Sequence, residues 1–175
     1  MFWHFFALLA LYLPAFIANG APVVASKAPG LRKWNVPIAA EWFGNNKTWR
    51  GYICGIFVAG ITGAVEHFFR HTLLLVSFGL HTSLFQSIGT GLLLGFGALS
   101  GDILKSFVKR RMGIPPGNAL PVLDGIDYII GALVVFLPFY VPTWWEILFL
   151  LIAAPVLSLL SNTTAHILGW KKVWY

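Results

Sequence analysis

Charged residues are scarce in this chain. Only 10% of its 175 residues are Asp, Glu, Lys or Arg, whereas 58% are hydrophobic and the mean hydropathy is +0.77. This composition excludes a soluble globular protein and predicts an integral membrane protein. The length predicts a single domain, residues 1–175.

The sequence also lacks several residue patterns that would indicate common kinds of chemistry. Cys54 is the only cysteine, so an internal disulfide is excluded, and no His and Cys residues have the spacing of a zinc site. The five histidines are scattered near the ends of hydrophobic runs, and no Ser, His and acid constellation suggests nucleophilic catalysis. The string from Gly101 to Ser106 lacks the Gly-Lys-Ser/Thr arrangement of a Walker loop.

Acidic residues are the rarer of the charged types. Six of them stand against twelve basic residues, which gives a formal net charge of +6. Such a charge can indicate nucleic-acid binding, but most of the basic residues lie between hydrophobic runs instead of on a polar face. A basic membrane surface with an anionic ligand explains this pattern better, so no nucleic-acid partner is expected.

Long uncharged stretches predict an all-α fold with five membrane-spanning helices, since a span needs about 20 mainly apolar residues. In the first span, Pro14 is expected to kink the helix, and the string Asn19-Gly20-Ala21-Pro22 is expected to loosen its end. The predicted spans lie in residues 1–26, from 51 to at least 65, between a turn at 79–83 and Asp102, at 128–145 and at 147–170.

The basic residues orient these spans. With the amino terminus outside, eleven of the twelve basic residues fall in the cytoplasm, in a loop at residues 27–50, around a second loop at about 111–123, and at Lys171 and Lys172. Only Arg70 then lies outside. The prediction is therefore a multi-pass protein of the cell membrane with a cytoplasmic carboxyl terminus and with both loops forming a site that faces the cytoplasm.

Small residues recur at four-residue spacing in the second and third spans. Such spacing lets the backbones of neighbouring helices approach closely. Packing inside the chain is the main expectation, and the seam of a homodimer is the alternative. The pairs are Gly51-x-x-x-Gly55, Gly91-x-x-x-Gly95 and Gly97-x-x-x-Gly101.

Charge is concentrated in residues 101–127, which hold three of the six acidic and four of the twelve basic residues. Charge at the end of a membrane helix is costly unless something binds there. On a helix, positions i, i+3, i+4 and i+7 share one face, and a carboxylate, two ammonium groups and a hydroxyl on one face suit a metal-bound polyphosphate. The residues at these positions are Asp102, Lys105, Ser106 and Lys109.

Two more acids, Asp124 and Asp127, are expected at the start of the fourth helix, where the helix dipole stabilises carboxylates. Asp124 alone could be a helix cap. Two acids three residues apart beside a basic helix end, however, indicate a cation-binding site. We predict that Asp102, Asp124 and Asp127 bind Mg²⁺, which accepts carboxylates together with substrate phosphates, and that these three and Lys105 are the catalytic residues.

Nucleotide-binding residues are predicted in the charged segment and in both loops. Arginine and lysine neutralise phosphates, and Asn side chains can both donate to and accept from a base edge. A simple topology anchor is the alternative for the basic run, and a solvated linker held by anionic lipid is the alternative for the first loop. The predicted nucleotide-binding residues are Asn46, Lys47, Arg50, Lys105, Ser106, Lys109, Arg110, Arg111 and Asn118.

Six strings of residues together resemble a known family. They are Pro14-Ala-Phe-Ile-Ala-Asn19, Lys47-Thr48-x-Arg50-Gly51, Gly101-Asp102-x-x-Lys105-Ser106, Ser106-x-x-Lys109-Arg110, Pro116-Gly117-Asn118 and Asp124-x-x-Asp127. In this order, over nearly the whole chain, they are similar to the CDP-archaeol synthases, the archaeal branch of the membrane cytidylyltransferases that make CDP-diacylglycerol. The bacterial pattern has a longer segment before the paired acids and a His-Gly-Gly, which this chain lacks, so the archaeal ether lipid is favoured.

The resemblance implies that CTP and 2,3-bis-O-geranylgeranylglycerol 1-phosphate, an unsaturated archaetidic acid, give CDP-archaeol and pyrophosphate. The second pKa of a phosphate monoester is about 6, so the lipid phosphate needs no strong general base. Metal and cations would offset the repulsion between the two anions. Two alternatives are a CDP-alcohol phosphotransferase, which requires more acids in a fixed array, and a small transporter of an anionic substrate, with charges at mid-membrane in several helices.

Overall fold

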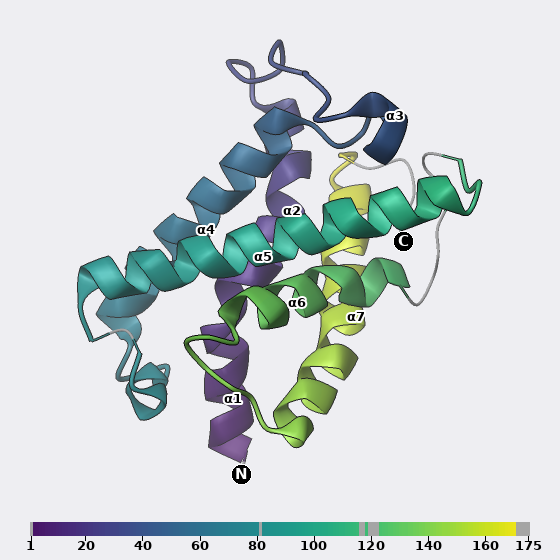
Figure 1. Ribbon diagram of the computed structural model, residues 1–175. Coiled ribbons are helices and arrows are strands. Elements are labelled where there is room, and N and C mark those ends of the chain that lie inside the picture. The colour runs from purple at the N-terminus through teal and green to yellow at the C-terminus, as the bar shows by residue number, and fades with distance from the viewer. Residues whose placement is uncertain (1, 81, 116–117, 119–122, 171–175) are drawn as a thin grey trace.

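The computed structural model describes residues 2–80, 82–115, 118 and 123–170. Within these residues the chain forms helices and no β-strand, so the all-α prediction is confirmed for the part described. In chain order (Figure 1), the elements are α1 (Phe2–Leu11), α2 (Leu13–Lys27), α3 (Ala40–Phe43), α4 (Trp49–Phe69), the 3₁₀ helix η1 (Leu75–Phe78), α5 (Leu84–Arg111), α6 (Leu123–Phe136) and α7 (Trp144–Ile167).

Several of these helices have the length and composition of membrane spans. Among the described residues, α4, α5 and α7 each qualify, and α1 and α2 qualify together as a pair bent by 43°. The structure therefore supports a multi-pass membrane protein with three or four candidate spans. Helix α6 has 14 residues, which is fewer than the roughly 20 needed to cross a bilayer on its own.

The first predicted span is bent where the sequence indicated. Helix α1 ends at Leu11, and Pro14 lies in the first turn of α2, where proline fits because its missing N–H has no helical partner there. The expectation that the string beginning at Asn19 would loosen the helix is wrong, since α2 continues through Pro22 to Lys27. Close packing against α4 explains the continued helix. The two helices approach so closely at Pro22 that a Cβ added at Gly51 of α4 would lie 3.0 Å from the proline ring.

The helices predicted as the fourth and fifth spans begin earlier than predicted. Helix α6 covers Leu123–Phe136 instead of 128–145, and Pro138 follows two residues after it, where proline commonly lies after a helix end. Helix α7 begins at Trp144, because Thr143 and Glu146 form a capping box, in which each side chain bonds to the other's backbone N–H. The acids Asp124 and Asp127 lie at the start of α6, as predicted.

Glycines bring α5 into close contact with the helices on either side of it, α4 and α6 (Figure 1). A Cβ added at Gly91 would lie 2.2 Å from the carbonyl oxygen of Ala59, and one added at Gly101 would lie 2.3 Å from that of Asp127. These glycines therefore pack inside the chain, which was the main expectation. The helix faces that carry them are covered and are not available to a second copy of the chain. The backbone of α5 is fixed at the point from which Asp102 projects.

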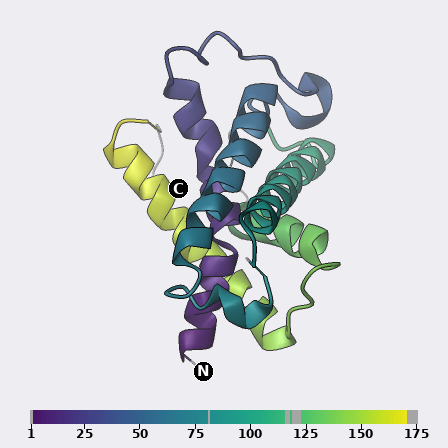
Figure 2. The same cartoon turned by 90° about the vertical axis from the view of Figure 1, so that its left-hand side faces the viewer.

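The first loop is folded onto the same end of α5. In α3, the ring centroid of Phe43 lies 6.3 Å from that of Phe107, and the centroid of Trp42 lies 6.1 Å from it. Thr48 then begins α4, where its hydroxyl accepts a hydrogen bond from the backbone of Gly51. Figure 2 shows α5 and α7 on opposite sides of α2, so this end of the molecule is built from α2, α5, α7 and the loop.

Candidate functional site

Three aspartates converge on one lysine. The Lys105 ammonium nitrogen lies 3.0 Å from Oδ1 of Asp102, 3.3 Å from Oδ1 of Asp124 and 2.9 Å from Oδ2 of Asp127. Asp102 and Lys105 are one turn apart on α5, and the other two acids come from the start of α6, which the Gly101 contact holds against α5. The four predicted catalytic residues therefore lie together.

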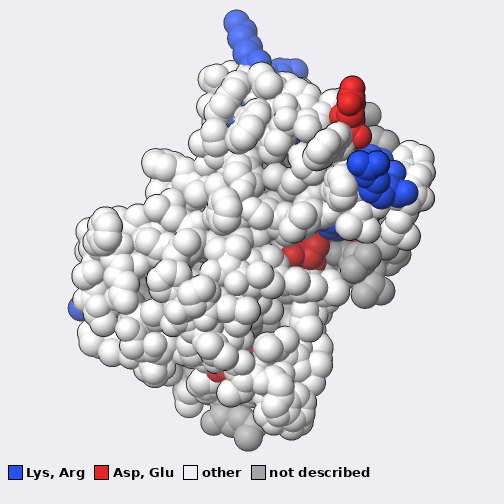
Figure 3. All heavy atoms as spheres, in the orientation of Figure 1, with Lys and Arg blue, Asp and Glu red and all other residues white. Residues whose placement is uncertain are grey.

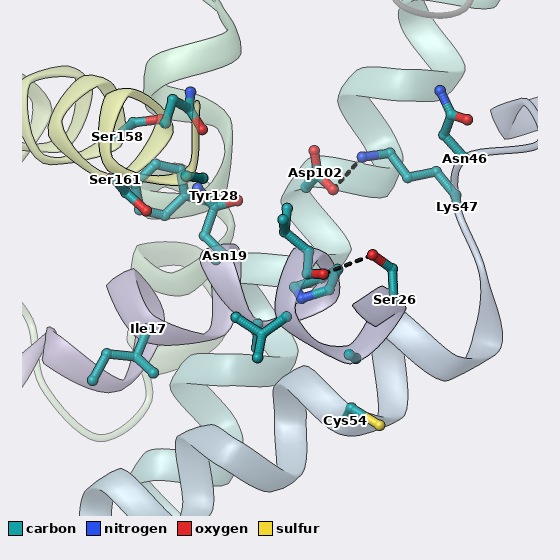
Figure 4. A pocket seen from close by; sticks show the side chains of 18 of the residues that line it. Ile17, Asn19, Ser26, Asn46, Lys47, Cys54, Asp102, Tyr128, Ser158 and Ser161 are labelled. Carbon is teal, nitrogen blue, oxygen red and sulfur yellow. Dashed lines mark hydrogen bonds and ion pairs between the residues drawn. The ribbon is translucent and has the colours of Figure 1, made fainter. Parts of the chain in front are cut away.

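Two further lysines connect this centre to the loops. Lys47 of the first loop forms an ion pair with Asp102 (Figure 4). The Lys109 ammonium lies 3.1 Å from each carboxylate oxygen of Asp124 and donates a 2.6 Å hydrogen bond to the backbone oxygen of Asn118. We call the three aspartates and these three lysines the charged cluster. It consists of Asp102, Asp124, Asp127, Lys47, Lys105 and Lys109.

The charged cluster is largely buried. The side chain of Lys105 is 13% exposed and that of Asp127 only 5% exposed. Oδ1 of Asp127 is buried and has no hydrogen-bond partner among the described residues. Burying ions is costly unless they are paired, and here three negative and three positive groups balance. Figure 3 shows a mostly uncharged face of the molecule, on which the visible charges gather mainly toward the end that carries α3.

A cavity of about 2030 Å³ opens beside the charged cluster. At its charged end lie Asp102 and Lys105, together with residues from both loops. From there the cavity extends between α2, α4 and α7 along apolar side chains such as Ile17, Phe57 and Ile61. The predicted site residues that line it are Asn46, Lys47, Arg50, Asp102, Lys105, Ser106, Lys109, Arg110, Asn118 and Asp124.

Arg50 lines this cavity, but its guanidinium holds the first loop together. It donates hydrogen bonds to the backbone oxygens of Leu31 and Arg32, at 3.2 and 3.3 Å, and to Oδ1 of Asn35 at 3.2 Å. The residue is 6% exposed. A buried guanidinium that is bonded to the backbone stabilises the loop that carries Lys47.

The other two arginines and Ser106 are likewise engaged with protein groups. Arg110 donates to the backbone oxygen of Ile114, where the second loop begins. Arg111 is exposed and its guanidinium lies 5.0 Å from the centre of the Phe107 ring. The Ser106 hydroxyl donates to the backbone oxygen of Asp102 at 3.0 Å. The cluster therefore brings together the lysines among the predicted nucleotide-binding residues, and the arginines lie around it.

Part of the predicted second loop, including Pro116, Gly117 and Pro121, lies outside the described residues, as do Lys171 and Lys172 at the tail. Asn118 is described, and it lines the same cavity as Asn46 of the first loop. Both loops thus contribute to the same cavity from their described parts.

Sequence reasoning missed a polar wall in the middle of this cavity. Asn19 of α2 and Ser158 and Ser161 of α7 line the cavity next to Tyr128 (Figure 4). Tyr128 donates to the backbone oxygen of Ala154 at 2.8 Å. A usable signal was present, because Ser158 and Ser161 are one turn apart in a membrane span, where polar side chains usually face a cavity or the helix bundle.

The donor chemistry of the three aspartates matches a hard cation, since Mg²⁺ prefers oxygen ligands. As the side chains stand, no three His, Cys, Asp or Glu residues in the described part of the chain are grouped closely enough to hold an ion. The point on which the carboxylates converge is taken by the Lys105 ammonium. The three carboxylates have the donor chemistry for a cation, which could occupy this point only after Lys105 has left it.

Comparisons with known proteins find one family whose members match this chain over nearly its whole length. The family model described as CarS-like CDP-archaeol synthase matches residues 1–175. The chain is 37% identical to the CDP-archaeol synthase of Pyrococcus abyssi over 92% of both proteins, and 33% identical to that of Thermococcus kodakarensis over 99% of this chain and 95% of the relative.

A solved structure is also similar to this chain. It is described as an intramembrane enzyme for archaeal membrane lipids biosynthesis, and it superposes with a TM-score of 0.68 at 30% sequence identity. The match covers 88% of this chain and 91% of the solved one. The helical fold is thus shared with an intramembrane enzyme.

Proposed function

Because the chain belongs to the CDP-archaeol synthase family, we infer that it is a CTP-dependent nucleotidyltransferase that makes CDP-archaeol in archaeal membrane lipid biosynthesis. Its substrates are CTP and 2,3-bis-O-geranylgeranylglycerol 1-phosphate, and pyrophosphate is the second product. The observation that carries this function in the structure is the shape of the cavity. One end is lined by ammonium groups that suit a polyphosphate, and the other is an apolar arm that suits prenyl chains.

The reaction requires two anions to meet. An oxygen of the lipid phosphate attacks the α-phosphorus of CTP, and the bond from that phosphorus to the bridging oxygen of the pyrophosphate breaks. Lys47, Lys105 and Lys109 supply the positive charge that offsets the repulsion and stabilises the leaving group. The nucleophile is already ionised at neutral pH, since its second pKa is about 6, and no residue needs to act as a strong base.

Asp102 and Asp124, which line the cavity, and the buried Asp127 beside them would hold Mg²⁺ at the charged end of the cavity. Bound there, the ion would offset the negative charge of the triphosphate. The three aspartates come from two helices in rigid contact, so they fix the position of the cation relative to α5. Lys109 links Asp124 to the second loop, so the metal ligands and the nucleotide-binding loops form one unit.

The lipid enters laterally between α2, α4 and α7, where the cavity is lined by apolar side chains. The polar wall lies between this arm and the charged cluster. Asn19, Ser158 and Ser161 can each donate a hydrogen bond, and the ether oxygens of the lipid glycerol can only accept. The polar wall therefore binds the glycerol backbone, and the phosphate reaches the lysines.

The nucleotide lies between the two loops, with Asn46 on one side and Asn118 on the other. Arg50 and Arg110 support these loops through their backbone oxygens. Arg111 projects outside the cavity and meets the nucleotide only at its edge. In the described part of the second loop, Gly113 and Pro115 lie in irregular backbone, which at membrane depth is tolerated where it lines a cavity.

The full topology has five spans, with α1 and α2 as one, followed by α4, α5, α6 and α7. Helix α6 is too short to span alone, so it crosses together with the apolar residues 137–141 that follow it. The amino terminus lies outside, and the carboxyl terminus and both loops lie in the cytoplasm. The positive residues of the first loop support this orientation. All of the spans contribute to one domain, residues 1–175, with the site at its cytoplasmic end.

An assay with purified protein tests the function. Incubation with CTP, Mg²⁺ and the geranylgeranyl glycerol phosphate should release pyrophosphate and form a CDP-lipid in equal amounts. A protein altered at Lys33, an exposed residue of the first loop, should behave in the same way. Release of CMP from a supplied CDP-lipid would instead indicate a phosphotransferase, and uptake of an anion into vesicles without pyrophosphate would indicate a transporter.

A further inference from the structure

Lys105 differs from the other two lysines of the charged cluster in the number of aspartates that it contacts. Its ammonium lies within 3.3 Å of all three, whereas the ion pairs of Lys47 and Lys109 are with Asp102 and Asp124 respectively. A positive charge thus already lies at the point where three oxygen donors converge.

Asp127 supports the same conclusion independently. It is 7% exposed, and the contact that neutralises it comes from Lys105 at 2.9 Å. Its second oxygen, Oδ1, is buried and accepts no hydrogen bond from a described residue. A buried carboxylate oxygen without a partner is costly, so this carboxylate is suited to a stronger ligand than one ammonium.

We propose that Lys105 holds the position of the divalent cation when no metal is bound, and that it moves onto the phosphates of CTP when the metal enters. This rests on the proposed function in one respect, that the three aspartates are the metal ligands. An ammonium about 3 Å from the carboxylates and an ion bound at ~2.1 Å cannot share one centre. The lysine stem is flexible and the ammonium faces the cavity, so the exchange needs no movement of α5.

The exchange has a thermodynamic consequence. Metal alone must displace Lys105 from three carboxylates, so it binds weakly. Metal with CTP gives the displaced ammonium three phosphates to contact, so each ligand increases the affinity for the other. Lys105 is then the residue that couples nucleotide binding to metal binding.

Binding of Mn²⁺ alone, measured from the electron paramagnetic resonance signal of the free ion, tests this in full-length detergent-solubilised protein. Lys105→Met should increase the Mn²⁺ affinity at least about tenfold, because removing a charge beside an ion in a partly buried site is a large electrostatic change. Lys109→Met removes the same charge but contacts only Asp124 among the three acids, so it should increase the affinity much less. Lys33→Met, at an exposed position that does not line the cavity, should change nothing.

An equal increase in Lys105→Met and Lys109→Met would show that only net charge matters and would overturn the proposal, as would no increase in Lys105→Met. The proposed metal site has a separate test. If Asp102→Asn and Asp127→Asn bind Mn²⁺ as the wild type does, the aspartates are not the ligands, and the failure lies in the proposed function.

Lysine labelling of the wild-type protein keeps the test independent of any variant. Acetylation of Lys105, followed by peptide mass spectrometry, should become several times faster when Mg²⁺ is added alone, because the ammonium leaves the carboxylates. Addition of CTP with Mg²⁺ should slow it again. Labelling of Lys105 that does not change with Mg²⁺ would contradict the exchange, and labelling of Lys33 is the internal control.

Discussion

At the scale of single residues, the three aspartates are not equivalent. Asp127 is the most deeply buried, and Asp124 lies at the first turn of α6, where it also contacts Lys109. Asp127→Asn should lower the CDP-lipid synthesis rate by about 10²-fold or more, since it removes a charge that the transition state needs. Asp124→Asn should have a similar effect if it binds metal, and circular dichroism should show intact helices in both. Near-normal turnover in Asp124→Asn would mean that Asp124 is only a helix cap.

Arg50 is expected to act on the loop instead of on the chemistry. Arg50→Gln loses the three hydrogen bonds to the first loop, which should cost about 1–3 kcal/mol of local stability. Trypsin should then cleave at Lys33 several times faster than in the wild type, and the apparent KM for CTP should increase with little change in kcat. A fall in kcat with normal trypsin resistance would place Arg50 on the substrate instead. Arg70→Gln, at the other end of α4, is the matched control.

The polar wall gives a prediction about the lipid. Asn19→Leu should raise the apparent KM for the lipid phosphate by about tenfold, the cost of roughly one hydrogen bond, and leave that for CTP nearly unchanged. Ser161→Ala removes a hydroxyl from the facing helix and should act in the same direction. Equal effects on both substrates would show that these residues shape the cavity without contacting the lipid. Kinetics at varied concentrations of each substrate separate the outcomes.

At the scale of elements, the sequence predicted the face of α5 well. The spacing of Asp102, Lys105 and Lys109 placed them on one stripe, and the structure has them on one continuous helix. Helix ends were harder to predict, because α6 stops before Pro138 and α7 starts at a capping box, both local features inside apolar runs. The roles of the arginines could not be predicted either, since Arg50 is bonded to backbone oxygens that only the folded loop brings near it.

Close packing between elements should be as important as the charges. Gly101 faces the backbone of α6, where an added Cβ would lie 2.3 Å from the backbone carbonyl oxygen of Asp127. Gly101→Ala should therefore push α6 away, destabilise the protein by about 1–3 kcal/mol as overpacking does, and reduce activity further by separating Asp102 from Asp127. Gly89→Ala is the control, since no atom lies within 4 Å of a Cβ there. Thermal unfolding in detergent measures the difference. Equal melting temperatures would mean that the α5–α6 contact can relax.

At the scale of the whole molecule, the fold must accommodate one highly charged substrate and one apolar substrate. A triphosphate and a prenylated lipid must share one cavity, although one is stable in water and the other in the bilayer. The chain gathers the charged cluster at one end of the cavity and leaves an apolar arm between α2, α4 and α7. Helices α1 and α2 are bent by 43° where they meet, and α5 crosses α2 (Figure 1).

The orientation of the molecule determines whether the charged cluster faces the cytoplasm, where CTP is available. Lys33 in the first loop and Ser77 in η1 are both exposed and lie in segments separated by α4. In a Cys54→Ser background, Lys33→Cys should react with a membrane-impermeant maleimide only in inside-out vesicles, and Ser77→Cys only in right-side-out vesicles. The physical reason is the excess of positive residues in the first loop, which favours its retention in the cytoplasm. Labelling of both cysteines from one side would contradict a spanning α4, and the reverse pattern would place the charged cluster outside, where CTP is not available to it.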